Sequence, residues 1–287
     1  MRIALITAPY SLGHEGVSVG AGPQEILAAG AVDALDHAGH EIEVVRVEPR
    51  TRETNEVGAS FEIVRRVAEA VAQAVAAGTF PLVLAGNCMN SIGIVAGLGR
   101  DVGVVWLDAH PDFNTPDGSL SGFADGMGLS ILTGTSWKAL RESVPRYRAV
   151  PEENVVLIGI RDITPPEQER LDVSEIQVLL PHEATDRIAE AIERLRERAE
   201  DVYLHVDLDV LDPSEGRVNE YAAEGGLSAA ALEEVIRAVT ERGAVRAAAL
   251  TAYDPSADLD RRIPAVAVRL ATRIADGAHA LVEGPTR

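Results

Sequence analysis

The sequence has very few cysteines: Cys88 is the only one among 287 residues. An internal disulfide is therefore excluded, and a lone thiol fits a reducing compartment. The sequence also lacks any apolar run of about 18 residues, the length that a membrane-crossing helix needs. The first ten residues carry one early charge and then an apolar stretch that meets Pro9, which is typical of a first strand and not of a signal peptide. We therefore expect a cytoplasmic protein.

Positive charge is scarce as well. There are 26 lysines and arginines against 45 aspartates and glutamates, so the formal net charge is −19. Nucleic acid and anionic membrane surfaces repel such a protein, and both are excluded as expected partners. Apolar residues make up 46% and charged residues 25%, the values of an ordinary globular chain with a large core. These features leave a small molecule as the expected partner.

Short β-branched apolar runs alternate with longer segments of helical period along the whole chain. Several of the runs are apolar on both faces, which is typical of parallel strands covered by helices on both sides. We find no internal repeat and no low-complexity linker. The sequence therefore predicts one three-layer α/β/α domain over residues 1–287, with a mainly parallel eight-stranded sheet. The predicted strands are residues 3–8, 41–47, 81–85, 102–107, 154–160, 175–180, 202–208 and 245–251. The predicted helices are residues 24–38, 60–77, 186–199, 229–240 and 264–281.

Acidic residues and one histidine follow two of the predicted strands. Asp108, His110 and Asp112 are spaced two residues apart, so in an extended segment their side chains point to one side. Asp207 and Asp209 follow another strand with the same spacing. Open α/β sheets bind ligands at these carboxyl ends, and burying four carboxylates without counter-charge is costly. We therefore predict a site for two divalent cations, with manganese favoured by oxygen and imidazole ligands.

Each of these aspartates taken singly has another reading, because aspartate at a strand end often caps a helix or forms a turn. His205, on the second strand, is predicted to pack in the core or to face away from the site. The remaining histidines have no partner in the sequence and stay unassigned: His14, His37, His40, His182 and His279.

Four segments together resemble the arginase/agmatinase (ureohydrolase) family. They are DAHPDFNTP at residues 108–116, HVDLDVLDP at 205–213, GGLS at 225–228 and GVxxGxGP at 16–23, in the family's order. The resemblance implies an arginase-like fold and two Mn²⁺ ions. It further implies a metal-bridging hydroxide that hydrolyses a non-peptide C–N bond of a guanidino or amidino compound. Homo-oligomers, trimers or hexamers, are also implied.

The chain departs from the family pattern at three places. Cys88 stands where the family has a metal-binding histidine, and the resemblance implies a thiolate ligand that would share a metal with Asp112; a small buried hydrophobe is the other reading. Asp125 stands where a histidine is often assigned to proton shuttling, so it is the candidate catalytic residue. Ala252 replaces the glutamate that holds the guanidinium, and Glu224 is the nearest replacement that the sequence offers.

Other positions concern the substrate. Asn114 and Ser121 match positions that hold the α-amino acid end in arginases, and Glu167 is predicted near the same mouth. The lost glutamate and the Cys88 exchange argue against plain arginine. They are similar to a branch that cleaves N-hydroxylated arginine, with agmatine-like compounds as further candidates. Two alternatives stay open: a non-enzymatic metal-binding or regulatory homologue, and a one-metal hydrolase in which Cys88 is not a ligand.

Overall fold

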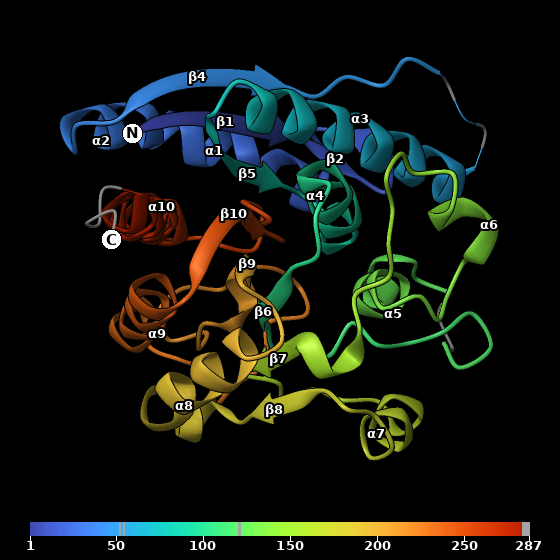
Figure 1. Cartoon of the computed structure of the whole chain (residues 1–287). Coiled ribbons are helices and arrows are strands. Elements are labelled where there is room, and N and C mark those ends of the chain that lie inside the picture. Colours follow the sequence, from blue (N-terminus) through green and yellow to red (C-terminus); the bar gives the residue numbers. More distant parts are fainter. Residues whose placement is uncertain (52, 54, 120–121, 283–287) are drawn as a thin grey trace.

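The computed structural model of the chain describes residues 1–51, 53, 55–119 and 122–282 (Figure 1). Eight strands form its central sheet: β1 (Arg2–Ala8), β4 (Glu41–Arg46), β5 (Phe80–Ala85), β6 (Gly103–Leu107), β7 (Val155–Ile158), β8 (Gln177–Leu179), β9 (Asp201–Asp207) and β10 (Ala244–Thr251). Their order is β4-β1-β5-β10-β9-β6-β7-β8, and every neighbouring pair is parallel. The predicted eight-stranded sheet is confirmed, strand by strand. A two-stranded hairpin, β2 (Tyr10–Ser11) with β3 (His14–Glu15), follows β1.

Helices cover both faces of the sheet. One hydrophobic core joins the sheet to α1 (Gly22–Ala28), α2 (Ala31–His37), α8 (Ala184–Arg196), α9 (Ala229–Arg242) and α10 (Ile263–Val282). A second core joins the opposite face to α3 (Glu56–Ala76), α4 (Ser91–Leu98) and α5 (Gly128–Leu132), with α6 (Lys138–Arg141) and α7 (Pro165–Leu171) further along this side. Along β1, Ile3 and Leu5 enter the first core while Ala4 and Ile6 enter the second. The predicted three layers are therefore present.

The helices differ from the sequence-based expectation in two ways. The predicted helix 24–38 is two helices, α1 and α2, because Gly30 adopts φ 95° between them and a left-handed residue breaks the hydrogen-bond ladder. The short helices α5, α6 and α7 were not predicted, and neither was α4. All eight of its residues are buried, so the apolar run has no amphipathic period from which a helix could be recognised. Other signals hold: Ser228 caps α9 by accepting a hydrogen bond from the Ala231 amide at 3.1 Å.

The strand order brings distant parts of the chain together at the carboxyl edge of the sheet. Strand β10 lies between β5 and β9, and β6 lies on the far side of β9 (Figure 1). Cys88, Asp108, Asp207 and Thr251 follow or end these four strands. Their side chains therefore meet at one edge, although up to 163 residues separate them.

Over the described residues, no helix has the length and apolar character to cross a membrane.

Candidate active site

Two groups of donor atoms lie together at this edge. Cys88, Asp108, His205 and Asp207 each offer one ligand atom, and these atoms all lie within 4.8 Å of one another. Asp108, His110 and Asp209 form a second such group. Asp108 belongs to both, so the groups are adjacent. The two acidic segments predicted from the sequence do converge.

Backbone and side-chain donors fix the directions of the carboxylates. Asp108 accepts hydrogen bonds from the Trp106 indole at 2.9 Å and from the His110 amide at 2.7 Å. Asp207 accepts from the Asp209 amide at 2.8 Å and from the Cys88 thiol at 2.8 Å. These hydrogen bonds fix the orientation of each carboxylate. The lone pairs that accept no hydrogen bond therefore have fixed directions, as in preorganised metal sites.

Histidine 110 lies between two acids. Its Nδ1 is 3.4 Å from Asp108 Oδ1 and 3.4 Å from Asp209 Oδ2. Although burial opposes it, these two carboxylates raise the pKa of His110 to about 12. Hydrogen bonds from His110 and Asn219 in turn lower the pKa of Asp209, despite its burial. In the metal-free protein His110 therefore supplies one positive charge to the cluster, a proton that a bound metal ion would replace.

The other carboxylates are not neutralised. Burial, with repulsion from Asp209 and Asp108, raises the pKa of Asp207 well above its ordinary value. Burial and the Asp108 and Asp125 charges do the same to Asp112. The pKa of Asp108 rises to about 6, mainly by burial. Divalent cations relieve this crowding of buried negative charge, and carboxylate, imidazole and thiolate are all metal ligands, so the residues present fit a pair of such ions.

Asp112 lies beside the two groups but belongs to neither. Its backbone has φ 48°, and its carbonyl accepts hydrogen bonds from the amides of Leu129 and Ser130. It lines the same cavity as Cys88 and His110. The partners of Cys88 in its group are thus Asp108, His205 and Asp207. That Cys88 and Asp112 share one metal stays a prediction, and both line the same cavity.

Asp125 holds the loop that carries Cys88. Its Oδ2 accepts a hydrogen bond from the Asn87 side chain at 2.7 Å, and its Oδ1 accepts from the Met89 amide at 2.9 Å. Burial raises the pKa of Asp125 to about 6 against these hydrogen bonds. Both oxygens are therefore engaged with residues flanking Cys88, an arrangement that positions the thiol.

A cavity of about 290 Å³ opens above these groups. The sequence-predicted Asn114 and Glu167 line it, together with Cys88, Asp125 and Ala252. The Glu167 carboxylate is buried and accepts hydrogen bonds from Phe113 and from Thr164, where it closes the capping box of α7. Ser121 lies outside the described residues.

The expectation for Glu224 needs correction. Glu224 is exposed and absent from the cavity lining, while its backbone carbonyl accepts a hydrogen bond from Arg161. Arg161 also donates hydrogen bonds to the carbonyls of Asp209, Leu211 and Ala223. These hydrogen bonds fix the loop that carries Glu224. The acid that lines the cavity from this loop is Glu220, followed by Tyr221.

Two contacts in the site were not predicted. His205 is buried, as expected, but it faces the Cys88 group, and burial lowers its pKa to about 3, so the ring is neutral. Asn219 bonds Asp209 Oδ2 and the Ala252 carbonyl, both at 3.1 Å. The only sequence signal for His205 was its position two residues before Asp207, which places it on the same side of β9.

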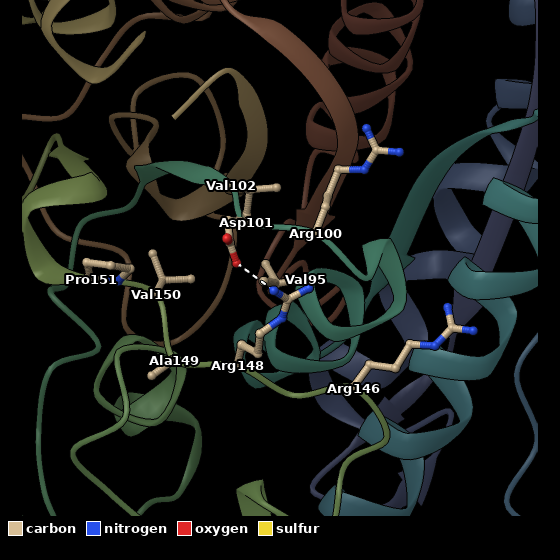
Figure 2. A pocket seen from close by; sticks show the side chains of 9 residues that line it. All are labelled: Val95, Arg100, Asp101, Val102, Arg146, Arg148, Ala149, Val150 and Pro151. Atoms are coloured by element: carbon tan, nitrogen blue, oxygen red, sulfur yellow. Dashed lines mark ion pairs between the residues drawn. The ribbon is translucent and has the colours of Figure 1, made fainter. Parts of the chain in front are cut away.

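The opposite edge of the sheet has a hollow of its own. It lies where β6 begins and is lined by Arg100, Asp101, Arg146 and Arg148 among others (Figure 2). Its volume is about 20 Å³, room for little more than one water molecule. Arg148 pairs with Asp101 at 3.0 Å, and Arg100 and Arg146 point away from the hollow (Figure 2). This hollow is therefore too small for a substrate, unlike the cavity at the carboxyl edge.

Comparison with known proteins agrees with this geometry. The family model described as the arginase family matches residues 1–276. The chain belongs to the arginase family. As a member it is a ureohydrolase, an enzyme that acts on C–N bonds in linear amidines, and dinuclear metal sites characterise this family.

Individual family members are similar over nearly the full chain. The arginase of Bacillus caldovelox is 31% identical over 287 residues, covering 93% of this chain and 96% of its own. Its crystal structure has a TM-score of 0.87, with 95% of this chain and 97% of that one covered at 30% identity. The Bacillus subtilis arginase structure also has a TM-score of 0.87, at 28% identity and with coverages of 96% and 98%. The fold of the whole sheet is thus shared with arginases.

Proposed function

We propose that this enzyme hydrolyses the guanidino C–N bond of an N-hydroxyarginine-like compound, using two divalent metal ions. The observation that carries the proposal is the pair of donor groups sharing Asp108 below a cavity whose wall at position 252 is a methyl group. Arginine and agmatine-like compounds are the other substrates to compare.

The donor groups assign residues to the metals. Cys88 and Asp207 would serve one ion, His110 and Asp209 the other, with Asp108 between them and Asp112 beside the pair. The family resemblance favours manganese. Bound divalent ions would lower the pKa of a water molecule to near neutrality and so supply the nucleophile.

Position 252 supports the substrate assignment. A guanidinium buried against Ala252 lacks the carboxylate that the family places there, and an unpaired buried charge costs about 3–5 kcal/mol. N-hydroxylation makes a guanidine a weaker base, so such a group enters uncharged at less cost. The cavity still offers hydrogen-bond partners for the amino acid end, among them Asn114 and the hydroxyls of Ser11 and Ser18.

The remaining parts of the proposal follow the family. We propose one domain over residues 1–287, assembled as a homo-oligomeric trimer or hexamer in the cytoplasm. Ser121 stays a candidate substrate residue by its match to the motif. Asp125 stays the candidate for moving a proton, and its hydrogen bonds to the Cys88 loop add a positioning role.

A substrate screen tests the function. Metal-loaded protein is incubated with arginine, N-hydroxyarginine, agmatine, guanidinobutyrate and guanidinopropionate, and the release of urea or hydroxyurea is measured. We expect the highest kcat/KM with N-hydroxyarginine, and none of this activity in Asp209→Asn, which loses a carboxylate of the His110 group. Faster turnover of arginine, or equal turnover in Asp209→Asn, would overturn the proposal.

A further inference from the structure

The imidazole of His205 lies close to Cys88. It is fully buried, with 0% of its surface exposed, and it belongs to the group of Cys88, Asp108 and Asp207. Its ring stacks on Trp106 with the centroids 3.7 Å apart. Trp106 also donates its indole N–H to Asp108. The ring plane is thus fixed by a residue that also orients one of the carboxylates.

Hydrogen bonds fix which ring nitrogen faces the group. Nδ1 lies 3.0 Å from Ser91 Oγ and 3.2 Å from the Tyr203 hydroxyl, and these hydroxyls are 2.8 Å apart. Both hydroxyls lie at Nδ1, so Nε2 is the ring nitrogen on the Thr251 and Cys88 side, and the tautomer in which Nδ1–H donates to Ser91 leaves Nε2 able to bind a metal. Metal-binding histidines are held in this way, by a hydrogen bond from the ring nitrogen that does not bind the metal.

In that tautomer Nε2 carries its lone pair on the Cys88 side. Its nearest partner is Thr251 Oγ1, at the long distance of 3.5 Å, and the same hydroxyl lies 3.2 Å from Cys88 Sγ. Thr251 has a second acceptor in the Val206 carbonyl at 3.4 Å. The buried imidazole therefore places Nε2 next to a thiol and two carboxylates.

We propose that His205 Nε2 is a metal ligand, and that Cys88, Asp108, Asp207 and His205 together select zinc or a similarly soft ion over manganese. The inference rests on the proposed metal-dependent function and goes beyond it. Sulfur, nitrogen and oxygen ligands in a set of four are typical of zinc, whereas manganese favours oxygen-rich sets. The family has a histidine ligand at the position of Cys88; in this chain His205 on strand β9 supplies an imidazole instead.

The two halves of the centre then differ in chemistry. The Asp108, His110 and Asp209 group has no sulfur, and its histidine is partly exposed. It suits a harder ion. The centre accordingly binds one soft and one hard ion more tightly than two ions of the same kind.

Metal titration of a His205 variant tests this proposal. Metal-free protein is titrated with Zn²⁺ and with Mn²⁺, and bound metal is counted by plasma emission spectrometry. His205→Gln is compared with His182→Gln, an exposed histidine that does not line the cavity. We expect His205→Gln to weaken one zinc site by about 100-fold or more, a loss at least as large as that from removing a partner of a ligand. The second site and His182→Gln keep the affinity of the unmodified protein.

A measurement on the unmodified protein covers the case in which His205→Gln does not fold. In protein with nitrogen-15-labelled histidine, zinc should shift the ring nitrogen resonances of His205 as well as those of His110. Unchanged zinc affinity in a folded His205→Gln, or a zinc response limited to His110, overturns the assignment. Failure of the unmodified protein to bind any divalent ion would instead overturn the proposed function.

Discussion

Strand β9 carries an aspartate at each end, and the two have opposite surroundings. At the amino end, Asp201 accepts hydrogen bonds from Arg100 at 2.8 Å and Arg246 at 2.5 Å. These arginines lower the pKa of Asp201 although burial opposes them. At the carboxyl end, burial and neighbouring carboxylates raise the pKa of Asp207. Among the described residues, Asp207 has no ion pair with an arginine or lysine.

The difference shows where the chain balances charge by itself and where it does not. Around Asp201 the two arginines complete structural ion pairs. Asp207 is an aspartate as well, but its neighbours are other carboxylates, so this end of the strand carries an excess of negative charge. Perturbed carboxylates of the second kind mark functional sites, because the missing counter-charge is brought by a ligand.

The largest expected effect comes from removing one charge at the carboxyl edge. Asp207→Asn should lower kcat/KM by about 1000-fold or more, or about 4 kcal/mol of transition-state stabilisation, because it weakens the metal pair. The metal-free variant should nevertheless melt at a higher temperature than the metal-free parent, since a repelled buried carboxylate is gone. Enzyme kinetics and thermal unfolding measure both. A metal-free variant that melts lower would show that Asp207 stabilises the fold, as Asp201 does.

The next effect concerns the thiol of the same cluster. Cys88→Ser should weaken one metal site by about 100-fold or more, at least as much as the loss of a partner of a ligand, and leave the other filled, because only one donor group contains Cys88. Metal counting over a range of free zinc concentrations measures this. Unchanged binding at both sites would favour the one-metal hydrolase in which Cys88 is not a ligand. Equal loss at both would mean that the two sites fill only together.

At the amino end the effect is on stability alone. Asp201→Asn should destabilise the protein by about 1–2 kcal/mol, less than for a fully buried pair because both arginines are about half exposed. The folded-state pKa of Asp201 is lowered, so its contribution is present above the unfolded pKa of about 4 and is lost as the pH falls through the folded value. Unfolding with denaturant at pH 7 and pH 3 measures this loss. Reduced activity in folded Asp201→Asn would contradict a purely structural role.

The smallest expected effect is a pH dependence of metal stabilisation. Asp108 and Asp125 have pKa values of about 6, above their unfolded values, so the metal-free fold loses stability as the pH rises from about 4 to 6. A bound metal ion removes this loss of stability, because its positive charge offsets the ionised carboxylates. The rise in melting temperature on adding metal should therefore be a few degrees larger at pH 8 than at pH 5.5. A rise independent of pH would mean that protons and metal do not compete for these carboxylates.

The sequence predicted those features that follow from local periodicity. The eight strands and the convergence of Asp108, Asp207 and Asp209 follow from alternation along each strand and from the parallel order. The role of His205 did not follow, although it lies two residues before Asp207. Whether its imidazole reaches the edge depends on Ser91, Tyr203 and Trp106, which come from other elements.

Loop residues were predicted less well. Glu224 was expected in the cavity, but Arg161 fixes its loop so that Glu220 lines the wall instead. The position of Asp125 was predicted, whereas its hydrogen bonds to both neighbours of Cys88 depend on a contact between residues 36 to 38 positions apart. Such contacts leave no periodic trace in the sequence.

The insertion of β10 between β5 and β9 also sets an order of events during synthesis. Cys88 and Asp207 are made well before Thr251, but the strands that carry them become neighbours of one strand only when β10 has emerged and paired with both. Long-range parallel pairing of this kind is slow, and the strands synthesised earlier stay without this partner until β10 is available. The donor group of Cys88 is therefore assembled only after β10 has paired, whereas that of His110 needs only the neighbouring strands β6 and β9.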